Sequence, residues 1–232
     1  MPRAAAHKKA VRRPAAAAKP RNCSFEAALR SIGFLGVCGV DEAGRGPLAG
    51  PVTAAAVILR PGSDISGIND SKKLTPAKRD ALFEAITHNA EDFGIAVVDA
   101  PDIDRINILR ASLLAMKTAV RSLSRRTPDF LLIDGRNTID SPTPQMALIK
   151  GDSRSVSVAA ASILAKVARD RIMAQYDEQY PGYGFARHKG YGTDAHLQAL
   201  ERLGPCPIHR KSFAPVARIL DPAPEQGGMF DA

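Results

Sequence analysis

Two adjacent acids stand beside a glycine- and arginine-rich segment in residues 39–52. Asp41 and Glu42 follow a short apolar run, and Gly44-Arg45-Gly46 comes almost directly after them. An ionised carboxylate is costly to bury without a partner, so acids at the end of an apolar strand need an explanation. Glycines let the backbone approach a ligand closely, and the arginine guanidinium matches the geometry of a phosphate. The segment therefore indicates metal-assisted chemistry on a phosphodiester.

Two more carboxylates follow short apolar runs further along the chain. Asp134 comes after residues 130–133, and Asp152 comes shortly after residues 146–149. Ligands of open α/β sheets bind beyond the strand ends, and carboxylates that converge there repel each other unless cations neutralise them. Such oxygen donors suit Mg²⁺ or Mn²⁺, and two ions can activate water and stabilise the leaving oxygen of a phosphodiester. Taken alone, each acid is more typical of a loop residue, so the prediction depends on the whole set.

The adjacency of the first two acids sets a geometric condition. Neighbouring residues on a regular strand point to opposite faces of the sheet. Asp41 and Glu42 can therefore share one site only if the strand bends or ends there. The glycines at positions 44 and 46 would allow such a bend.

The elements expected to position these residues alternate between strands and helices, which favours an α/β fold. Apolar runs predict strands at residues 37–40, 52–59, 94–98, 130–133 and 146–149. Helical spacing and capping signals predict helices at residues 76–89, 103–123 and 156–173, and a short helix from residue 193. We expect one domain at residues 31–220, between a disordered basic arm at 1–30 and a disordered tail at 221–232.

The net charge of +8 on this 232-residue chain is unevenly distributed. Seven Lys and Arg residues and no acid lie within residues 1–25, which leaves about +1 for the rest. The body is therefore not strongly basic on average, and a nucleic-acid face requires local clustering. No apolar run approaches the roughly 18 residues of a membrane helix, and the N-terminus lacks a secretory signal. Three cysteines without a Cys-x-x-Cys motif favour a reducing cytoplasm.

The motifs, taken in order, resemble those of ribonuclease HII. Residues 39–52 are similar to the opening motif of that family, and the resemblance spans roughly residues 36–217. Any one motif is weak to moderate, whereas the ordered set is specific. The further motifs are Asn69-Asp70-Ser71-Lys72-Lys73-Leu74, Asp104-Arg105-Ile106-Asn107-Ile108, Asp134-Gly135, Lys150-Gly151-Asp152, Ala159-Ala160-Ala161-Ser162-Ile163-Leu164-Ala165-Lys166, Arg169-Asp170-Arg171, His188-Lys189-Gly190-Tyr191-Gly192-Thr193 and His209-Arg210-Lys211-Ser212-Phe213.

The resemblance implies a ribonuclease H-like fold, with a mixed central sheet flanked by helices and a C-terminal helical and loop region. It implies an endoribonuclease that cuts the RNA strand of RNA·DNA hybrids and cuts 5′ of single ribonucleotides embedded in duplex DNA. The products would carry 3′-hydroxyl and 5′-phosphate ends. Four acids of the family hold two Mn²⁺ or Mg²⁺ ions, and the matching residues here are Asp41, Glu42, Asp134 and Asp152. Asp170 competes for the fourth place, but its mid-helix position between two arginines favours a structural ion pair.

The resemblance also implies which residues recognise the substrate. Gly44, Arg45 and Gly46 resemble the element that senses the 2′-hydroxyl, a group that both donates and accepts hydrogen bonds. Tyr191 resembles the tyrosine that recognises the junction of ribose and deoxyribose, although alone it is typical of a packed surface tyrosine. Lys72 and Lys73 are predicted phosphate contacts, with loop solubility as an equal alternative. The stretches Arg187-His188-Lys189 and His209-Arg210-Lys211 would supply the local positive clustering.

Two rival functions and one protein partner stay open at this point. Ribonuclease HIII has similar acids and a sizeable N-terminal substrate-binding domain, whereas about 35 residues precede the first strand here. A non-catalytic nucleic-acid-binding module would not need four acids at strand ends. Gln226-Gly227-Gly228-Met229-Phe230 looks like the short peptide that docks in a bacterial sliding clamp. The resemblance also suggests a monomer.

Overall fold

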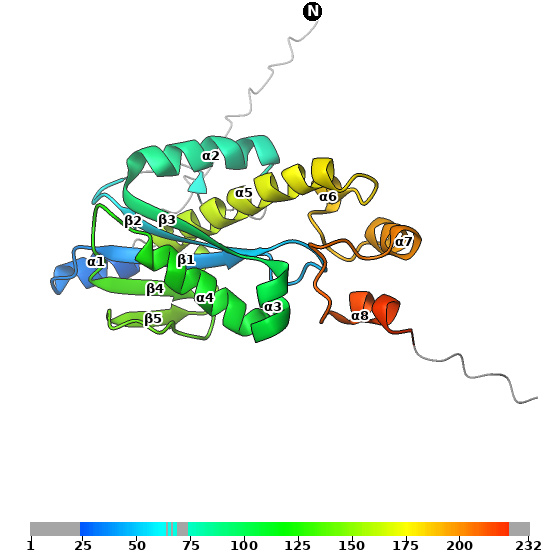
Figure 1. Cartoon of the computed structure of the whole chain (residues 1–232). Helices are drawn as coiled ribbons and strands as arrows, with labels where there is room; N and C mark the ends of the chain where they lie inside the picture. The colour runs from blue at the N-terminus through cyan, green and yellow to red at the C-terminus, as the bar shows by residue number, and fades with distance from the viewer. Residues whose placement is uncertain (1–23, 64, 66, 69–73, 223–232) are drawn as a thin grey trace, which may run out of the picture.

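A five-stranded mixed sheet forms the centre of the computed structural model (Figure 1). The structure describes residues 24–63, 65, 67–68 and 74–222. The strand order is β3-β2-β1-β4-β5, and β1 runs antiparallel to β2 and parallel to β4. The strands are β1 (Val37–Ala43), β2 (Val52–Leu59), β3 (Ala90–Val98), β4 (Phe130–Asp134) and β5 (Gln145–Leu148).

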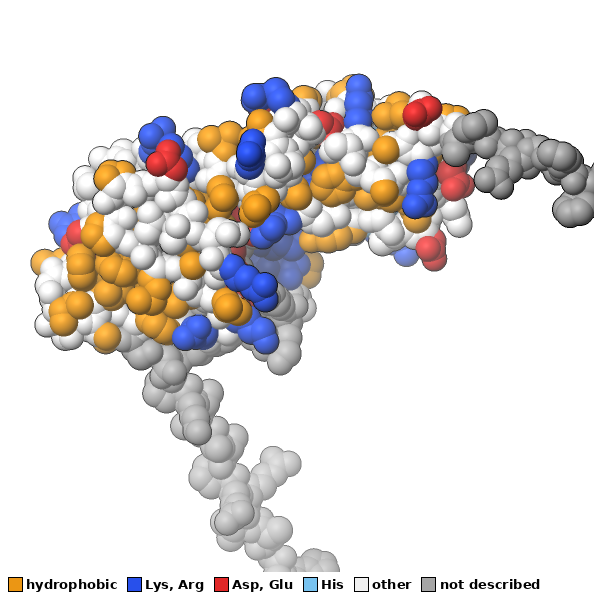
Figure 2. Space-filling view, turned by 90° about the horizontal axis from the view of Figure 1, so that it is seen from below, with side chains coloured by type: hydrophobic (Ala, Val, Ile, Leu, Met, Phe, Trp, Pro, Cys, Tyr) orange, Lys and Arg blue, Asp and Glu red, His pale blue; other side chains and the backbone are white. Residues whose placement is uncertain are grey.

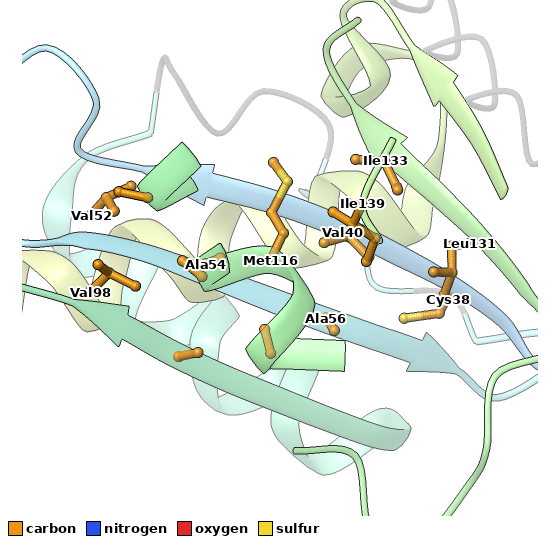
Figure 3. Packing of buried hydrophobic residues seen from close by; sticks show 14 of the residues in the cluster. Cys38, Val40, Val52, Ala54, Ala56, Val98, Met116, Leu131, Ile133 and Ile139 are labelled. Carbon is orange, nitrogen blue, oxygen red and sulfur yellow. The ribbon is translucent and has the colours of Figure 1, made fainter. Parts of the chain in front are cut away.

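Helices cover both faces of the sheet, which explains why every residue of β2 is buried. One face carries α3 (Ala100–Ile106) and α4 (Ile108–Arg121), and the other carries α2 (Pro76–Asn89) and α5 (Val156–Gln179). Successive residues of β2 alternate between the two layers. Ala54 belongs to the cluster with Met116 of α4 (Figure 3), whereas Ala55 packs beneath α5.

A break at Asn107 divides the helix predicted at residues 103–123 into α3 and α4. Asn107 has φ +68°, a left-handed conformation that a continuous helix does not contain. Its side-chain oxygen accepts a hydrogen bond from the amide of Arg110 at 3.1 Å and so caps α4. The prediction of one helix is wrong here because the apolar spacing continues across the break.

Helix α1 (Ser24–Ser31) occupies residues that the sequence placed in a disordered arm. Glu26 is only 2% exposed, and its Oε1 accepts hydrogen bonds from the hydroxyls of Ser155 and Ser157 at 2.5 and 2.7 Å. These serines stand at the start of α5, so α1 is joined to the helix that packs on β1. Residues 24–30 therefore belong to the folded domain, and the boundary predicted at residue 31 is wrong.

The C-terminal part consists of α6 (Phe185–His188), α7 (Asp194–Leu203) and α8 (Ala214–Leu220), which lie to one side of the sheet (Figure 1). Leu48, in the segment after β1, packs against Leu200 of α7 and Val216 of α8. The C-terminal helices thus pack on the segment that follows β1. Within the described residues, we find no helix that is long and apolar enough to cross a membrane.

Candidate active site

Asp41 and Asp134 are neighbours on adjacent parallel strands. The register of β1 and β4 pairs Val40 with Ile133, so the next residue of each strand is an aspartate. Side chains at paired positions of parallel strands project from the same face of the sheet. The structure therefore brings together two of the acids that the sequence singled out.

The face on which Asp41 projects is set by a glycine two residues earlier. A Cβ atom at Gly39 would lie 2.0 Å from the carbonyl carbon of Ser157, so α5 lies directly on this position. By the alternation of a strand, Asp41 projects toward the same helix, where the side chain of Ser162 hydrogen-bonds to it. Ser162 matched the family motif without an evident role, and the structure gives it this contact.

Glu42 lies inside a continuous strand and not after its end. The predicted end of the strand at residue 40 is wrong, because Glu42 still pairs with Ala54 and Ala43 pairs with Thr53 of β2. Only the pairing with β4 stops at Val40. The charge of Glu42 nevertheless raises the pKa of Asp41, so the two carboxylates are close although the strand does not end between them. The Glu42 amide donates to Asp41 Oδ1 at 2.7 Å, and Arg45 Nη1 donates to Glu42 Oε1 at 3.2 Å.

Burial gives these carboxylates an unfavourable electrostatic environment. The pKa of Asp41 is raised well above its ordinary value, first by desolvation and then by the charges of Glu42 and Asp134. Desolvation also raises the pKa of Glu42, although the nearby Arg45 opposes this shift. Carboxylates that are both desolvated and mutually repulsive favour a cation among them.

One oxygen atom among these carboxylates is well suited to be a metal ligand. Glu42 Oε2 is buried and has no hydrogen-bond partner among the described residues, a state that usually costs stability. Hard carboxylate oxygens of this kind suit Mg²⁺ or Mn²⁺. In the described part of the chain, no three His, Cys, Asp or Glu side chains are already arranged to hold an ion. The four predicted ligands therefore do not form a complete cage, and Mg²⁺ ordinarily needs only one or two carboxylates beside water and substrate phosphate.

Asp152 occupies a turn that is docked on Asp134. The predicted strand ends at Leu148, and Asp152 lies in the short 3₁₀ helix η2 (Gly151–Ser153) that leads into α5. Asp134 Oδ1 accepts a hydrogen bond from the amide of Gly151 at 2.6 Å, one residue before Asp152. The fourth predicted acid is thus held beside the third by the backbone.

Asp170, the competitor for the fourth place, forms an ion pair with Lys166 one turn earlier on α5. The sequence predicted a structural ion pair for this residue but pointed to the flanking Arg169 and Arg171. Arg171 instead contacts Asp80 and Glu84 of α2. The ion pair therefore supports a structural role for Asp170, but its partner is Lys166 and not one of the two flanking arginines.

Two buried arginines hold the segment that follows β1. Arg210 donates to the carbonyl oxygens of Gly44, Arg45 and Gly50 at 2.5, 2.9 and 3.0 Å. Arg169 donates to the carbonyl oxygens of Pro51, Lys189 and Ala49 at 2.9, 3.0 and 3.1 Å. These side chains are 0% and 1% exposed, respectively. The carbonyl groups of the glycine-rich segment are thereby turned inward and satisfied.

The sequence pattern does not reveal this role for either arginine. His209-Arg210-Lys211 was expected to add exposed positive charge, yet Arg210 and His209 are buried and only Lys211 is exposed. Lys and Arg side chains elsewhere gather near the junction of the body with the C-terminal part, on the face shown in Figure 2. A short charged stretch does not indicate which of its residues is buried, because the partners are carbonyl groups distant in sequence.

A pocket of about 420 Å³ lies beside the acids and contains the predicted recognition residues. Tyr191 is 46% exposed, and a Cβ atom at Gly46 would lie 3.7 Å from its ring. Lys72 and Lys73 lie outside the described residues. The pocket is lined by Glu42, Ala43, Gly44, Arg45, Gly46, Arg79, Ser162, Lys166 and Tyr191.

Comparison with known proteins identifies the family. The sequence model described as ribonuclease HII matches residues 38–216. The chain belongs to the ribonuclease HII family. The ribonuclease HII of Geobacter sulfurreducens is 55% identical over 202 residues, which cover 87% of this chain and 93% of that protein. The recognition of the family from the ordered motifs is confirmed.

Solved ribonuclease structures confirm the predicted fold class. The ribonuclease H2 structure from Pyrococcus horikoshii OT3 is 28% identical with a TM-score of 0.67, covering 79% of this chain and 96% of that one. The ribonuclease HII in a complex with PCNA from Archaeoglobus fulgidus is 26% identical with a TM-score of 0.59, covering 72% and 85%. A ribonuclease HIII structure shares the fold at 22% identity, with a TM-score of 0.65 and coverage of 94% and 76%.

Proposed function

We propose that this chain is an endoribonuclease that cuts the RNA strand of RNA·DNA hybrids and cuts duplex DNA 5′ of a single ribonucleotide. The observation that carries the proposal is that Asp41 and Asp134 directly follow the last paired residues of β1 and β4, beside the pocket formed by the Gly44–Gly46 segment and Tyr191. Membership of the ribonuclease HII family supports it. The products are a 3′-hydroxyl and a 5′-phosphate.

The acids of the site hold divalent metal. Asp41, Glu42, Asp134 and Asp152 would hold two Mn²⁺ or Mg²⁺ ions, and such ions would supply an activated water and stabilisation of the leaving 3′-oxygen. Glu42 contributes the oxygen that has no protein partner in the described residues, and Ser162 orients the carboxylate of Asp41. Gly151 orients Asp134 through its amide. These two contacts orient the carboxylates of Asp41 and Asp134 before substrate arrives.

Recognition of the ribose takes place in the adjoining pocket. Arg210 and Arg169 occupy the carbonyl groups around the Gly44–Gly46 segment, so the glycines can present their amides and a close backbone surface to the 2′-hydroxyl. Tyr191 packs on the sugar that follows. Arg45 connects recognition with chemistry, because it pairs with Glu42 while half of its side chain stays exposed to a phosphate.

A second function, that of a non-catalytic nucleic-acid-binding module, is less well supported. The desolvated carboxylates of Asp41 and Glu42 would repel a phosphate backbone and would give such a module no advantage. Ribonuclease HIII is the closer rival in chemistry, but its structural likeness at 22% identity shows the fold alone.

The protein partner and the setting are also proposals. We infer that Gln226-Gly227-Gly228-Met229-Phe230, which lies outside the described residues, binds a sliding clamp, as the complex of the Archaeoglobus protein with PCNA suggests. Deletion of residues 226–232 should abolish retention by an immobilised clamp, and unchanged retention would remove the idea. We propose a monomer in a reducing cytoplasm, where Cys38 and Cys206 stay free thiols.

The deciding experiment uses duplex DNA with one embedded ribonucleotide, assayed separately with Mg²⁺ and Mn²⁺. We expect a single cut on the 5′ side of the ribonucleotide and none in an all-DNA control of the same sequence. No cleavage with either ion would contradict the enzymatic function. Cleavage of long hybrids without cleavage at the single ribonucleotide would contradict the roles given to Arg45 and Tyr191.

A further inference from the structure

Three histidines gather around one buried aromatic ring in the C-terminal part. Phe185 is fully buried, and the rings of His188, His196 and His209 lie 5.9, 5.5 and 5.6 Å from it. His196 and His209 are 0% and 1% exposed, and the ring of His188 stacks on His196 at 4.5 Å. The proposed chemistry at the acids uses none of these rings. Their burial therefore needs a separate explanation.

Backbone partners fix the proton positions on two of these rings. A backbone amide can only donate, and the Cys206 amide lies 2.9 Å from His209 Nδ1. The Cys206 carbonyl oxygen lies farther from the same nitrogen, at 3.3 Å, so the shorter contact makes Nδ1 the acceptor. A carbonyl can only accept, and the Tyr191 carbonyl lies 2.9 Å from His196 Nδ1, so this nitrogen carries a proton. The two Nε2 atoms lie 3.1 Å apart, and the remaining proton of His209 points at the bare Nε2 of His196.

The result is a continuous hydrogen-bonded chain through two neutral imidazoles. It runs from the Cys206 amide through His209 and His196 to the carbonyl oxygen of Tyr191. The backbone of Tyr191 is also held on its amide side, because this amide donates to the His188 carbonyl oxygen at 3.0 Å. The neighbouring Gly190 carbonyl accepts from the Leu48 amide at 2.8 Å, which connects this segment with the loop after β1.

We propose that His196 and His209 are positioning residues that hold Tyr191 against the Gly44–Gly46 segment, and that they do so only while both imidazoles are neutral. The inference rests on the proposed function, because it gives Tyr191 its role in recognising the sugar. A second proton disrupts the chain on either ring. On His196 it would face the Nε2 proton of His209 at 3.1 Å, and on His209 it would displace the amide of Cys206.

The surroundings of the two rings favour the neutral state. The titratable groups that face them are His188, which stacks on His196, and Cys206 and Tyr183, which contact His209. Burial lowers the pKa of His209 to about 4, with the charge of His196 as the next cause, and burial lowers the pKa of His196 as well. Burial raises the pKa of Cys206 and of Tyr183, so neither supplies a negative charge near neutral pH.

The first test reads the proton positions directly. Protein labelled with ¹⁵N-histidine is followed by two-bond ¹H–¹⁵N correlation spectra between pH 8 and 4. We expect one buried histidine as the Nδ1–H tautomer and another as the Nε2–H tautomer, both uncharged at pH 6. Two Nε2–H tautomers, or titration of both buried rings near pH 6.5, would overturn the chain.

The second test measures the consequence for recognition. We compare kcat/KM on the single-ribonucleotide duplex with kcat/KM on a long RNA·DNA hybrid, because effects of pH on metal and water cancel in this ratio. His196→Leu removes the anchor, and we expect the ratio to fall about tenfold at pH 7.5. His196→Asn places an amide donor near the position of Nδ1, so it should restore the ratio of the two kcat/KM values. Because an amide does not titrate, this ratio should not fall at acid pH as it does in the wild type.

Matched measurements separate the possible outcomes. His88→Asn removes an exposed histidine from α2 and should leave the ratio and its pH profile unchanged. A wild-type ratio that stays constant from pH 7.5 down to pH 4, where the pKa of about 4 places the second proton of His209, would overturn the positioning role, even if His196→Leu fails to fold. Failure of the wild type to cut either substrate would contradict the proposed function and with it the role of Tyr191, whereas the spectra would still decide the chain.

Discussion

Arg210 Nη2 donates to the carbonyl oxygen of Gly44 at 2.5 Å, across a separation of 166 residues. The guanidinium has five donors in a rigid plane, and here it satisfies three carbonyl groups of the segment after β1. Its plane also lies over the ring of Phe213, with Cζ 5.1 Å from the ring centre. A side chain from the C-terminal part therefore shapes the backbone on which the proposed ribose recognition depends.

The first prediction tests this relationship with Arg210→Lys. A lysine keeps the charge but cannot reach all three carbonyl groups, and each buried polar group left unpaired costs about 1–3 kcal/mol. We expect the free energy of unfolding to fall by about 2–5 kcal/mol and KM for the single-ribonucleotide duplex to rise. Arg218→Lys makes the same chemical change on the exposed side of α8 and should leave both quantities within error. Equal behaviour of the two variants in urea unfolding and in KM would refute the role of Arg210.

Much of the site could be predicted from the sequence, because local pattern encodes it. An apolar run followed by an acid predicts a buried strand whose end carries a carboxylate, and two such strands in parallel bring Asp41 beside Asp134. The ordered motifs supplied the family and hence the relation between Tyr191 and the Gly44–Gly46 segment. These inferences needed only the order of residues and the general rules of α/β sheets.

The remaining features depend on contacts that are distant in the chain. Arg169 and Arg210 are charged residues in polar stretches, and nothing near them in sequence reveals the carbonyl groups that bury them. The pairing of Glu42 with Ala54 depends on where β1 ends and β2 begins, which the glycine-rich turn between them does not fix. Asn107 has a left-handed backbone inside a regular apolar repeat, so the pattern predicted a continuous helix.

The second prediction concerns the conformation of Gly44. This residue has φ +98°, and a Cβ atom there would lie 2.1 Å from Arg169 Nε and 2.7 Å from the Pro51 carbonyl. Gly44→Ala therefore combines backbone strain of about 1–2 kcal/mol with a clash that displaces a buried arginine. Gly62→Ala is the matched control, since Gly62 has φ +76° and a Cβ atom there would meet no other atom within 4 Å. We expect urea unfolding to show a loss for Gly44→Ala that exceeds the control by about 1–3 kcal/mol.

The third prediction follows from the raised pKa of Asp41. A carboxyl whose folded pKa is raised favours the folded state below its unfolded pKa, and this contribution is lost as pH rises through the folded pKa. In metal-free protein, Asp41→Asn should therefore raise the melting temperature at neutral pH. The rise should be about 2–4 °C for each kcal/mol gained in the free energy of unfolding. The advantage should shrink toward pH 4.

The same variant should lose function while it gains stability. Removal of a metal ligand should weaken Mn²⁺ binding in calorimetry and lower kcat/KM by about 100-fold or more. Asp140→Asn changes an exposed aspartate that is paired with Lys117 of α4, and it should preserve both Mn²⁺ affinity and activity. If metal-free Asp41→Asn melts below the wild type at pH 7, the explanation by buried, repelling carboxylates is wrong.

The fourth prediction decides the fourth acid by comparing Asp152→Asn with Asp170→Asn. Asp152 directly follows Gly151, whose amide donates a hydrogen bond to Asp134. Loss of the Asp152 carboxylate should therefore remove metal affinity and lower kcat by about 100-fold or more. Asp170 is paired with Lys166, and its replacement should cost only about 0.3–1 kcal/mol of stability with activity within threefold. Both variants remove one carboxylate and keep its shape, so each is the control for the other. A folded Asp152→Asn protein of near-normal activity, together with an inactive Asp170→Asn protein, would transfer the metal role to α5.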